Sequence, residues 1–415
     1  MTHLKRIVST FLIIAFTMWF TQALADTAEN SGEQSLAIAN TAATPQPASP
    51  PTLVPPPPNI DAKGYILMDA NTGMVLAQKN MDEHLQPASL TKLMTLYLTF
   101  QALQSGQIHL TDSVRISKEA WQIGGSRMFL KVGSHVPVEQ LIQGIIVASG
   151  NDACVAISQY IAGTQDTFAQ LMNQTAARLG MTNSHFVDPT GLPRPEHYST
   201  PHDLAILTRA IINDFPQYYH FFSQKWITFN HIKQPNRNRL LWRDDAVDGL
   251  KTGHTEEAGY CLIASAKRSD MRLISVVMGT PTDSARANDS QAILNYGFRF
   301  YKSYKLFDAN QVLIKPRIWM AHHKYSKFGL AKPLYVTIPI GEYKHLNATM
   351  DVNPNLQAPI IKGQQYGEVQ VTLNGKPITK APLVALQDDK RGGAWSRTTD
   401  HIALFFKGMF GKRSS

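Results

Sequence analysis

Three short polar motifs constrain the fold of this chain more than any other feature. The second lies about 60 residues after the first, and the third about 100 residues after the second. They are Ser89–Lys92 (Ser-Leu-Thr-Lys), Ser149–Asn151 (Ser-Gly-Asn) and Lys251–Gly253 (Lys-Thr-Gly). Each motif alone has an ordinary explanation, as a helix cap, a turn, or a polar turn before a strand. Chance is a poor explanation for all three in one chain, so we expect a fold that brings them to one site.

The first two motifs carry the groups needed for nucleophilic catalysis. Ser89 and Lys92 are three residues apart, which on a helix places both side chains on one face. A lysine amine can take the proton of a neighbouring serine when burial or nearby positive charge lowers its pKa. We expect Ser89 at a helix N-terminus, where the helix dipole favours negative charge. Ser149 is a candidate proton relay between Lys92 and the leaving group, and Asn151 a candidate to hold a substrate carbonyl.

The third motif suits an anionic substrate. Lys251 brings positive charge toward the nucleophile and toward a substrate carboxylate, and Thr252 offers a hydroxyl to the same group. Gly253 lets a substrate backbone approach a strand edge closely. We expect this motif just before a strand that starts at Tyr260.

The N-terminus predicts export. Basic residues Lys5-Arg6 precede the apolar run Phe11–Phe20, and the small residues Ala23–Ala25 follow it. The run is shorter than the about 20 apolar residues of a spanning helix, so a cleaved signal peptide over residues 1–25 is favoured over a membrane anchor. The net charge of +9 suits an anionic partner. Export argues against nucleic acid as that partner.

The rest of the chain divides into four segments. Residues 26–61 are rich in Pro and Ala and read as an extended linker. Residues 62–310 predict an α/β domain in which a helical cluster is inserted between the N-terminal and C-terminal strands of one antiparallel sheet. The expected strands there are Tyr65–Met68, Met74–Ala77, Tyr260–Ala264 and Leu273–Met278, and the expected helices are Ser89–Leu103, Val138–Ala148, Cys154–Ala162, Gln165–Leu179, Pro201–Asn213 and Gln291–Tyr301. Residues 311–388 predict a small all-β domain with a hairpin at Asn374-Gly375.

The last segment, residues 389–415, predicts an amphipathic helix. From Lys390 onward it holds six basic residues and one acidic residue, Asp400. The aromatic and aliphatic residues that share one helical face are Trp395, Ile402, Phe405, Phe406, Met409 and Phe410. Such a helix lies in a membrane interface and is held there by anionic lipid. The alternative is a helix that docks on the protein's own core; the one-sided charge favours the membrane.

The three motifs with their flanking residues carry a family resemblance. The stretches Pro87–Thr95, Ala148–Cys154 and Asp248–Thr255 are similar to the signatures of the low-molecular-mass penicillin-binding proteins, the serine-type D-alanyl-D-alanine carboxypeptidases of an S11-like peptidase family. The resemblance runs from about Ala62 to the C-terminus and leaves out the linker. It implies a transpeptidase fold like that of penicillin-binding proteins and β-lactamases, followed by a β domain and a membrane-anchoring helix.

The resemblance also implies a reaction. Ser89 attacks the carbonyl of the penultimate D-alanine of a peptidoglycan stem, Lys92 acts as general base, and the backbone amides of Ser89 and His254 hold the oxyanion. The substrate's terminal carboxylate binds to Lys251 and Thr252. By position in the family pattern, Arg237 and Arg286 assist there, although structural ion pairing is the alternative for both. Penicillins and other β-lactams acylate the serine. The enzyme lies on the periplasmic face of the inner membrane, and its β domain acts as a spacer.

Three other functions stay open. A class A β-lactamase shares the motifs, but the chain between Asn151 and Lys251 has one glutamate, Glu196, and lacks the Glu-x-x-x-Asn pattern of those enzymes. An endopeptidase of the superfamily generally lacks the β domain and tail. A non-catalytic wall-binding protein keeps the fold without the activity.

The remaining sequence signals point to no cofactor. The chain has no His-Glu-x-x-His run and no phosphate-loop pattern, so we expect neither a metal nor a nucleotide. Cys154 and Cys261 are too few for a disulfide framework, and the sequence leaves open two buried thiols or one disulfide. The deacylation rate and the oligomeric state are beyond the sequence.

Overall fold

The computed structural model describes residues 54–410 and the short strand β1 (Ser35–Leu36). The expected signal peptide and most of the linker lie outside the described residues. The chain divides into two compact units. One runs as far as Tyr304 and adds Thr337–Ile340, and the other comprises Lys305–Val336 and the residues from Gly341 onward.

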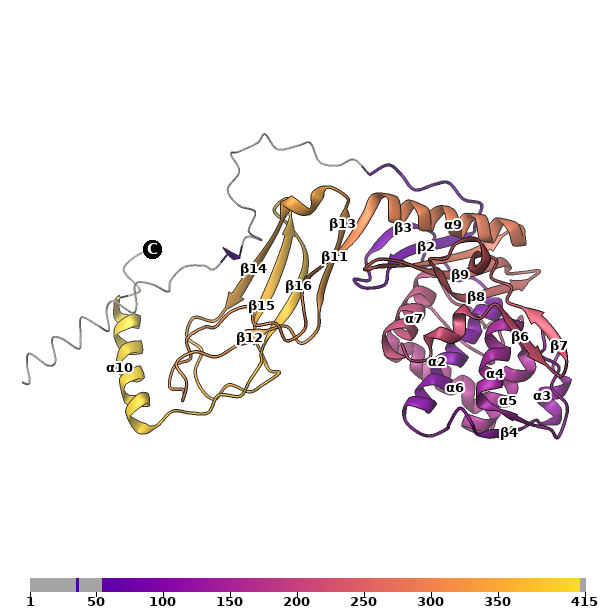
Figure 1. Ribbon diagram of the computed structural model, residues 1–415, viewed down its shortest axis with the longest axis horizontal. Helices are drawn as coiled ribbons and strands as arrows, with labels where there is room; N and C mark the ends of the chain where they lie inside the picture. Colours follow the sequence, from indigo (N-terminus) through magenta and orange to yellow (C-terminus); the bar gives the residue numbers. More distant parts are fainter. Residues whose placement is uncertain (1–34, 37–53, 411–415) are drawn as a thin grey trace, which may run out of the picture. The chain divides into compact units, whose positions relative to one another are not determined.

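An antiparallel five-stranded sheet organises the larger unit, with the order β3-β2-β10-β9-β8 (Figure 1). Its strands are β2 (Gly64–Asp69), β3 (Val75–Lys79), β8 (Val247–Thr255), β9 (Gly259–Arg268) and β10 (Met271–Thr280). The N-terminal strand β2 pairs with β10, more than 200 residues later, with Ile66 opposite Val276. The helical residues in between are therefore an insertion in one sheet, which confirms the expected architecture.

Helices cover both faces of this sheet. They are α2 (Lys92–Gln104), α3 (Lys118–Gln122), α4 (Val138–Gln143), α5 (Asn151–Ala162), α6 (Gln165–Leu179), α7 (Pro201–Asp214), α8 (Leu240–Arg243) and α9 (Asp283–Phe300). Shorter turns are η1 (Ala88–Thr91), η2 (Gly144–Ala148) and η3 (Tyr219–Ser223), and the two-stranded ribbons are β4 (Ser113–Arg115) with β5 (His135–Pro137) and β6 (Trp226–Phe229) with β7 (Ile232–Pro235). Helix α9 begins earlier than the expected Gln291, because the Thr282 side chain accepts a hydrogen bond from the Ala285 N–H and caps it.

Two hydrophobic cores lie against the two faces of the sheet. Alternate residues of β2 point to opposite faces, so Ile66 packs with one core and Leu67 with the other. The first core contains Phe100 of α2, and the second contains Ile293 of α9. Each of these side chains is fully buried and stabilises the fold by about 1.5–3 kcal/mol. This two-sided burial explains why β2 reads as a continuous apolar run in the sequence.

The smaller unit is built on β strands, as expected. Its main sheet has five strands in the order β1-β14-β15-β16-β12. Strand β11 pairs with β13, and the residues of these two strands are divided between the two units. Their bounds are β11 (Tyr301–Phe307), β12 (Phe328–Gly329), β13 (Leu334–Pro339), β14 (Leu346–Val352), β15 (Gln365–Leu373) and β16 (Lys376–Ala385), with the turn η4 (Glu342–His345). Asn374 and Gly375, both with positive φ, join β15 to β16. The Asn-Gly hairpin prediction is confirmed.

A C-terminal helix, α10 (Ala394–Phe410), is present where the sequence predicted one. The side chains after Leu404 lie outside the described residues, so the apolar face expected at Phe405, Phe406, Met409 and Phe410 stays a prediction. The carboxylate of Asp400 accepts hydrogen bonds from Arg317 (3.0 Å) and from the Met320 N–H (2.6 Å). In the part of the chain that the structure describes, no helix has the length and apolarity needed to cross a membrane.

Candidate active site

The Ser89 and Lys92 side chains meet at the start of α2. Ser89 lies in η1, and α2 begins at Lys92. The Lys92 ammonium donates to the Ser89 Oγ at 2.7 Å and to the Thr190 carbonyl at 2.6 Å. Lys92 is completely buried. The expected pairing of a serine hydroxyl with a desolvated lysine amine is therefore present.

The second and third motifs meet in the same way. The Lys251 ammonium donates to the Ser149 Oγ at 2.9 Å and to the Thr252 carbonyl at 3.0 Å. Ser149 has a left-handed backbone, with φ of 56°, and it ends η2. This conformation is uncommon for a residue with a side chain and recurs at functional sites. Both side chains are buried.

The Lys251–Gly253 motif precedes a strand that begins at Gly259 (β9), as expected, but it also lies inside a strand of its own, β8, which the sequence analysis did not predict. Strand β8 is the edge of the sheet and packs against η1. A Cβ atom at Gly253 would lie 3.0 Å from the Pro87 carbonyl oxygen and 3.3 Å from Leu90. Glycine at this position therefore lets the edge strand approach the turn that carries Ser89.

Asn151 is the first residue of α5, and its side-chain Nδ2 donates to the Gly124 carbonyl at 2.8 Å. The next residue, Asp152, is buried and accepts hydrogen bonds from the Met128 and Leu130 N–H groups, both at 3.0 Å. These bonds fasten the loop of residues 123–130 to the start of α5. Sequence analysis missed this role of Asp152, which follows the second motif directly.

Burial dominates the electrostatics of both lysines. It lowers the pKa of Lys92 to about 8, while the charge of Asp188 opposes that shift. Burial also lowers the pKa of Lys251 well below its ordinary value, and the charges of Lys92 and Arg237 lower it further. At a pKa of about 8, roughly a tenth of the Lys92 amines are neutral at pH 7. The site thus combines an available base with a concentration of positive charge.

A loop that the sequence analysis did not single out completes the surroundings of Lys92. The Asp188 Oδ1 accepts hydrogen bonds from the Thr190 N–H (2.7 Å), the Thr190 hydroxyl (2.6 Å) and the Gly191 N–H (2.9 Å). These bonds fix the Thr190 carbonyl that accepts from Lys92. An aspartate followed by Pro, Thr and Gly is a turn signal, but nothing local shows which part of the protein such a turn faces.

A buried histidine links this loop to η1, the turn that carries Ser89. The His197 Nδ1 lies 3.8 Å from the Asp188 carboxylate, and its Nε2 is 2.9 Å from the Thr91 hydroxyl. Burial acts to raise the pKa of Asp188, but the neighbouring His197 ring and the hydrogen bonds from Thr190 outweigh it and hold that pKa well below the usual range. Asp188 is therefore an anion at neutral pH.

The two arginines have different surroundings. Arg237 donates to the Ser126 Oγ at 2.8 Å, and burial lowers its pKa. Arg286 is buried and donates to the Gly253 carbonyl at 3.0 Å and to Asp283. Direct substrate binding by either arginine stays a prediction, and the contacts of Arg286 favour a role in holding β8.

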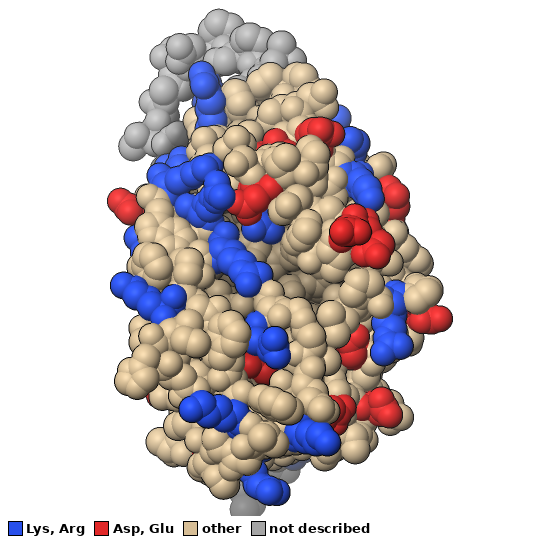
Figure 2. Space-filling view, turned by 90° about the vertical axis from the view of Figure 1, so that its right-hand side faces the viewer, with Lys and Arg blue, Asp and Glu red and all other residues tan. Residues whose placement is uncertain are grey.

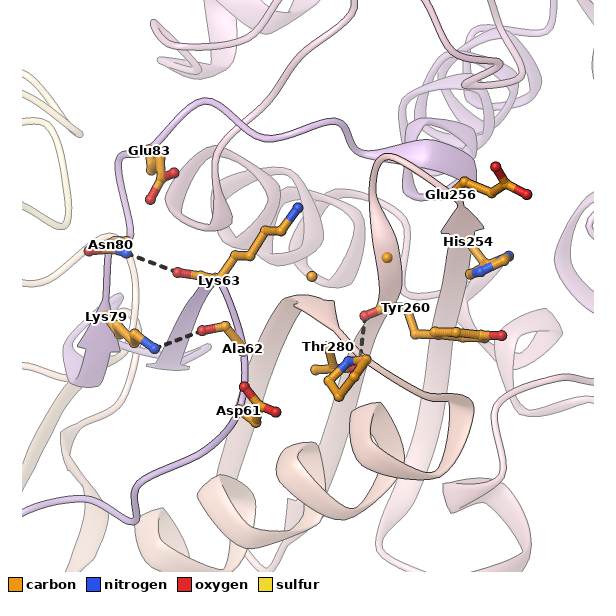
Figure 3. Close-up of a pocket in the computed structure, with 13 residues that line it drawn as sticks. Asp61, Ala62, Lys63, Lys79, Asn80, Glu83, His254, Glu256, Tyr260 and Thr280 are labelled. Atoms are coloured by element: carbon orange, nitrogen blue, oxygen red, sulfur yellow. Dashed lines mark hydrogen bonds between the residues drawn. The ribbon is translucent and has the colours of Figure 1, made fainter.

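His254 follows the third motif, and its ring stacks on Tyr260 with 3.9 Å between the centroids. It borders an open cavity of about 820 Å³ at one end of the sheet. In the view of Figure 3, Glu83 and Glu256 lie on opposite sides of this cavity, with the Lys63 side chain between them.

The face that carries the β6–β7 ribbon in Figure 1 is turned toward the viewer in Figure 2. It is hollowed near its centre, and Lys and Arg side chains gather beside the hollow (Figure 2). Within the described residues, no group of three or more His, Cys, Asp and Glu side chains is placed to hold a metal ion. Cys154 and Cys261 are both buried free thiols.

Comparisons with known proteins agree with this geometry. The family model described as D-alanyl-D-alanine carboxypeptidase matches residues 51–282, and the model described as penicillin-binding protein 5, C-terminal domain, matches residues 301–391. The chain is 44% identical over 362 residues to the D-alanyl-D-alanine carboxypeptidase DacC of Escherichia coli, which covers 85% of this chain and 90% of that protein. It is 42% identical over 360 residues to the D-alanyl-D-alanine carboxypeptidase DacA of Haemophilus influenzae, and the match covers 85% of this chain and 92% of that protein.

Solved structures give the same result. Penicillin-binding protein 5 from Haemophilus influenzae superimposes with a TM-score of 0.76 at 43% identity, over 81% of this chain and 99% of that one. Penicillin-binding protein D2 from Listeria monocytogenes, in its ampicillin-bound form, superimposes with a TM-score of 0.55 at 28% identity, over 59% of this chain and 100% of that one.

Proposed function

The chain belongs to the D-alanyl-D-alanine carboxypeptidase family and is a serine-type carboxypeptidase that acts on peptidoglycan, and we propose that Ser89 is its nucleophile. The observation that carries the proposal is the 2.7 Å hydrogen bond from Lys92 to the Ser89 Oγ. In its neutral form Lys92 takes the Ser89 proton as the Oγ attacks the carbonyl of the penultimate D-alanine. Burial supplies the neutral form, because it lowers the pKa of Lys92 to about 8.

The second step releases D-alanine. The tetrahedral oxyanion is held by the backbone N–H groups of Ser89 and His254, and donors of this kind often supply the largest catalytic effect. The bond between the acyl carbon and the leaving nitrogen then breaks, and the leaving amine takes a proton through Ser149. The 2.9 Å hydrogen bond from Lys251 to Ser149 supports this relay. Water hydrolyses the acyl-enzyme and restores Ser89.

The substrate's terminal carboxylate is bound by Lys251, Thr252 and Arg237. Burial lowers the pKa of Lys251, and the positive charges of Lys92 and Arg237 lower it further, so a carboxylate would enter a strongly positive site. Asn151 holds a peptide carbonyl of the substrate, and Gly253 keeps the edge strand close to the nucleophile. Arg286, bonded to the Gly253 carbonyl, acts through β8 rather than on the substrate.

β-Lactams acylate Ser89 in the same way. The ampicillin-bound relative from Listeria monocytogenes supports this part of the proposal. A β-lactam presents a carbonyl to the nucleophile and a carboxylate to the positive groups, so it uses the same contacts as the peptide. The amine that is released when the lactam ring opens remains part of the acyl group. It therefore cannot diffuse away and clear the site as D-alanine does.

The enzyme is held at an anionic membrane surface by α10 and works on the periplasmic face of the inner membrane. Two observations support this anchoring. Asp400, the one acidic residue after Lys390, is bonded to Arg317 and to the Met320 N–H. Its negative charge is thus neutralised within the protein, which leaves the basic residues of the tail available to anionic lipid. Trp395 is 76% exposed, which leaves a large aromatic ring available to a lipid interface.

Release of D-alanine tests the function directly. The exported chain, residues 26–415, is compared with its Ser89→Ala variant on a peptide that ends in L-Lys-D-Ala-D-Ala. We expect the wild type to release D-alanine and the variant to release none. Release by both proteins would overturn the assignment of Ser89, and release by neither, with both shown to be folded, would favour a non-catalytic wall-binding role.

A further inference from the structure

The open cavity beside His254 adjoins the site that contains Ser89. Its volume is about 820 Å³. One wall is the segment that leads from β3 to η1, and another is the turn that joins β8 to β9. The chain segments that form these walls come together where Gly253 approaches Pro87, because a Cβ atom at Gly253 would lie 3.0 Å from the Pro87 carbonyl oxygen. Pro87 is two residues before Ser89, so the cavity opens next to the nucleophile.

The proposed function fixes the direction in which a substrate runs along β8. Its terminal carboxylate lies at Lys251 and Thr252, and the carbonyl of the penultimate D-alanine lies at the His254 N–H. From its carboxylate end, the substrate therefore advances toward Thr255, where β8 ends. An extended peptide paired with an edge strand advances about 3.3 Å per residue. The residue before the penultimate D-alanine thus lies beyond His254, where the cavity opens.

Two glycines in the lining make room for a lysine side chain. Gly259 and Gly279, in the neighbouring strands β9 and β10, have φ of +66° and +75°. A Cβ atom at Gly279 would lie 2.6 Å from the Cγ of Lys63. The Lys63 ammonium reaches the turn between β8 and β9, where it donates to the Glu257 carbonyl at 3.3 Å. Glycine at position 279 therefore lets a positive charge enter the cavity from β2.

Two carboxylates border the cavity on opposite sides. They belong to Glu83 and Glu256, both exposed, and the Lys63 side chain lies between them (Figure 3). Among the residues that the structure describes, neither carboxylate forms an ion pair. The lining also contains Asp61 and Lys79, but the Lys79 ammonium is committed to a backbone carbonyl at 2.8 Å. An ammonium that enters the cavity thus meets acceptors on both sides, and a carboxylate meets Lys63.

We propose that this cavity is a subsite for the residue that precedes the two D-alanines, and that it selects a side chain ending in an amine. The inference rests on the proposed function, which sets the direction of the substrate. The ammonium binds to Glu83 and Glu256, and a carboxylate on the same side chain binds to Lys63. The ligand class is a diamino acid: L-lysine supplies the amine alone, and 2,6-diaminopimelate supplies an amine with a carboxylate beside it.

The test compares four peptides of the form acetyl-X-D-Ala-D-Ala with the exported chain, residues 26–415. X is L-lysine, Nε-acetyl-L-lysine, L-norleucine or meso-2,6-diaminopimelate joined through its L-centre. The kcat/KM for D-alanine release is measured for the wild type, Glu83→Gln, Glu256→Gln and the double variant. Glu257→Gln is the matched control, because Glu257 lies in the same turn as Glu256 and is exposed, but does not line the cavity.

We expect the wild type to prefer the L-lysine peptide to the Nε-acetyl-L-lysine peptide about three- to tenfold, the effect of one or two exposed ion pairs. This ratio should fall close to one in the double variant and keep its wild-type value in Glu257→Gln. It should also shrink at high salt, because salt screens exposed charges. The norleucine peptide should behave like the acetylated one, since it fills the cavity without a charge.

The diaminopimelate peptide distinguishes the two sources of the amine. If the stem carries diaminopimelate, this peptide should exceed the L-lysine peptide in the wild type and lose that advantage in Lys63→Met. Methionine keeps an unbranched side chain beside Gly279 and removes the charge. A diaminopimelate peptide that is no better than the L-lysine peptide assigns the subsite to L-lysine. Either result, together with the preference for a free amine, supports the subsite and names its ligand.

Two results would overturn the inference while leaving the proposed function in place. One is an equal kcat/KM for the L-lysine and Nε-acetyl-L-lysine peptides in the wild type. The other is a preference for the free amine that the double variant retains in full. If folded wild type released D-alanine from none of the four peptides, the proposed function would fail and this inference with it.

Discussion

The Lys92 ammonium donates to the carbonyl of Thr190 at 2.6 Å, although the two residues are 98 positions apart in the sequence. Lys92, the residue expected to activate Ser89, is thus oriented by a loop around Thr190 that lies in none of the three motifs. The loop is itself fixed by Asp188, whose carboxylate accepts from the backbone and side chain of Thr190. The base is held in place from a distant part of the chain.

The lowered pKa of Lys92 predicts how acylation depends on pH. Only the neutral amine accepts the Ser89 proton, so the acylation rate should rise with pH up to an inflection near 8 and fall about tenfold per unit well below it. Stopped-flow acylation by a fluorescent penicillin, from pH 5.5 to 9.5, measures the profile. A rate that is constant across this range would show that the lysine is not the titrating base.

Removal of the Asp188 charge should affect the base without touching the substrate. Asp188 raises the pKa of Lys92, so Asp188→Asn should move the inflection to lower pH. The weakened hold on Thr190 should also reduce kcat by about 10- to 100-fold, with a smaller change in KM. The matched control is Asp166→Asn, in the exposed first turn of α6, which should leave both the profile and the rate unchanged. A merely structural role for Asp188 would lower the amount of active enzyme but leave the inflection where it is.

Gly191 should tolerate no side chain. Its φ is +80°, and a Cβ atom there would lie 1.8 Å from the Ala88 carbonyl oxygen. We expect Gly191→Ala to lower the free energy of unfolding by about 2–5 kcal/mol, as the sum of left-handed strain and overpacking. Gly106 has a φ of +74° with nothing within 4 Å, so Gly106→Ala isolates the strain and should cost about 1–2 kcal/mol. Equal losses in urea titrations of the two variants would contradict the steric argument.

Substitutions of Arg237 and Arg286 should have different effects on the kinetics of peptide hydrolysis. If Arg237 binds the terminal carboxylate, Arg237→Gln should raise KM for D-Ala-D-Ala peptides about 10- to 100-fold, and the change should nearly disappear for peptides that end in a carboxamide. Arg286→Gln removes a donor from the Gly253 carbonyl and should lower activity on both kinds of peptide. Steady-state kinetics on the two peptide series checks this. An equal loss on carboxylate and carboxamide peptides in Arg237→Gln would remove Arg237 from carboxylate binding.

The tail should be necessary for membrane association and dispensable for hydrolysis. A chain that ends at Gly393, just before α10, keeps the contact of Gly392 with the Met320 carbonyl. We expect it to stay in the supernatant with anionic vesicles, while the full chain sediments with them and less so at high salt. Neutral vesicles serve as the control. Unchanged sedimentation of the truncated chain would place the membrane contact elsewhere.

The sequence predicted the elements whose patterns are local. Helix α6 occupies the expected Gln165–Leu179, and the Asn374-Gly375 pair forms the expected hairpin, because side-chain periodicity and turn chemistry act over a few residues. The pairing of Ser89 with Lys92 belongs to the same class, since three residues of helix suffice to bring them together. The order of the motifs was enough to indicate the family and its fold.

The tertiary structure decided what depends on contacts between distant residues. The residues Val247–Thr255 are mostly polar or glycine and carry no strand pattern of their own, yet they form β8 because β9 supplies hydrogen bonds along one edge and η1 packs close to Gly253. The roles of Asp188, His197 and Arg286 are of the same kind. Each role depends on a contact between residues far apart in the sequence: Lys92 with the loop that Asp188 fixes, Thr91 with His197, and Gly253 with Arg286. Local sequence preferences do not specify such contacts.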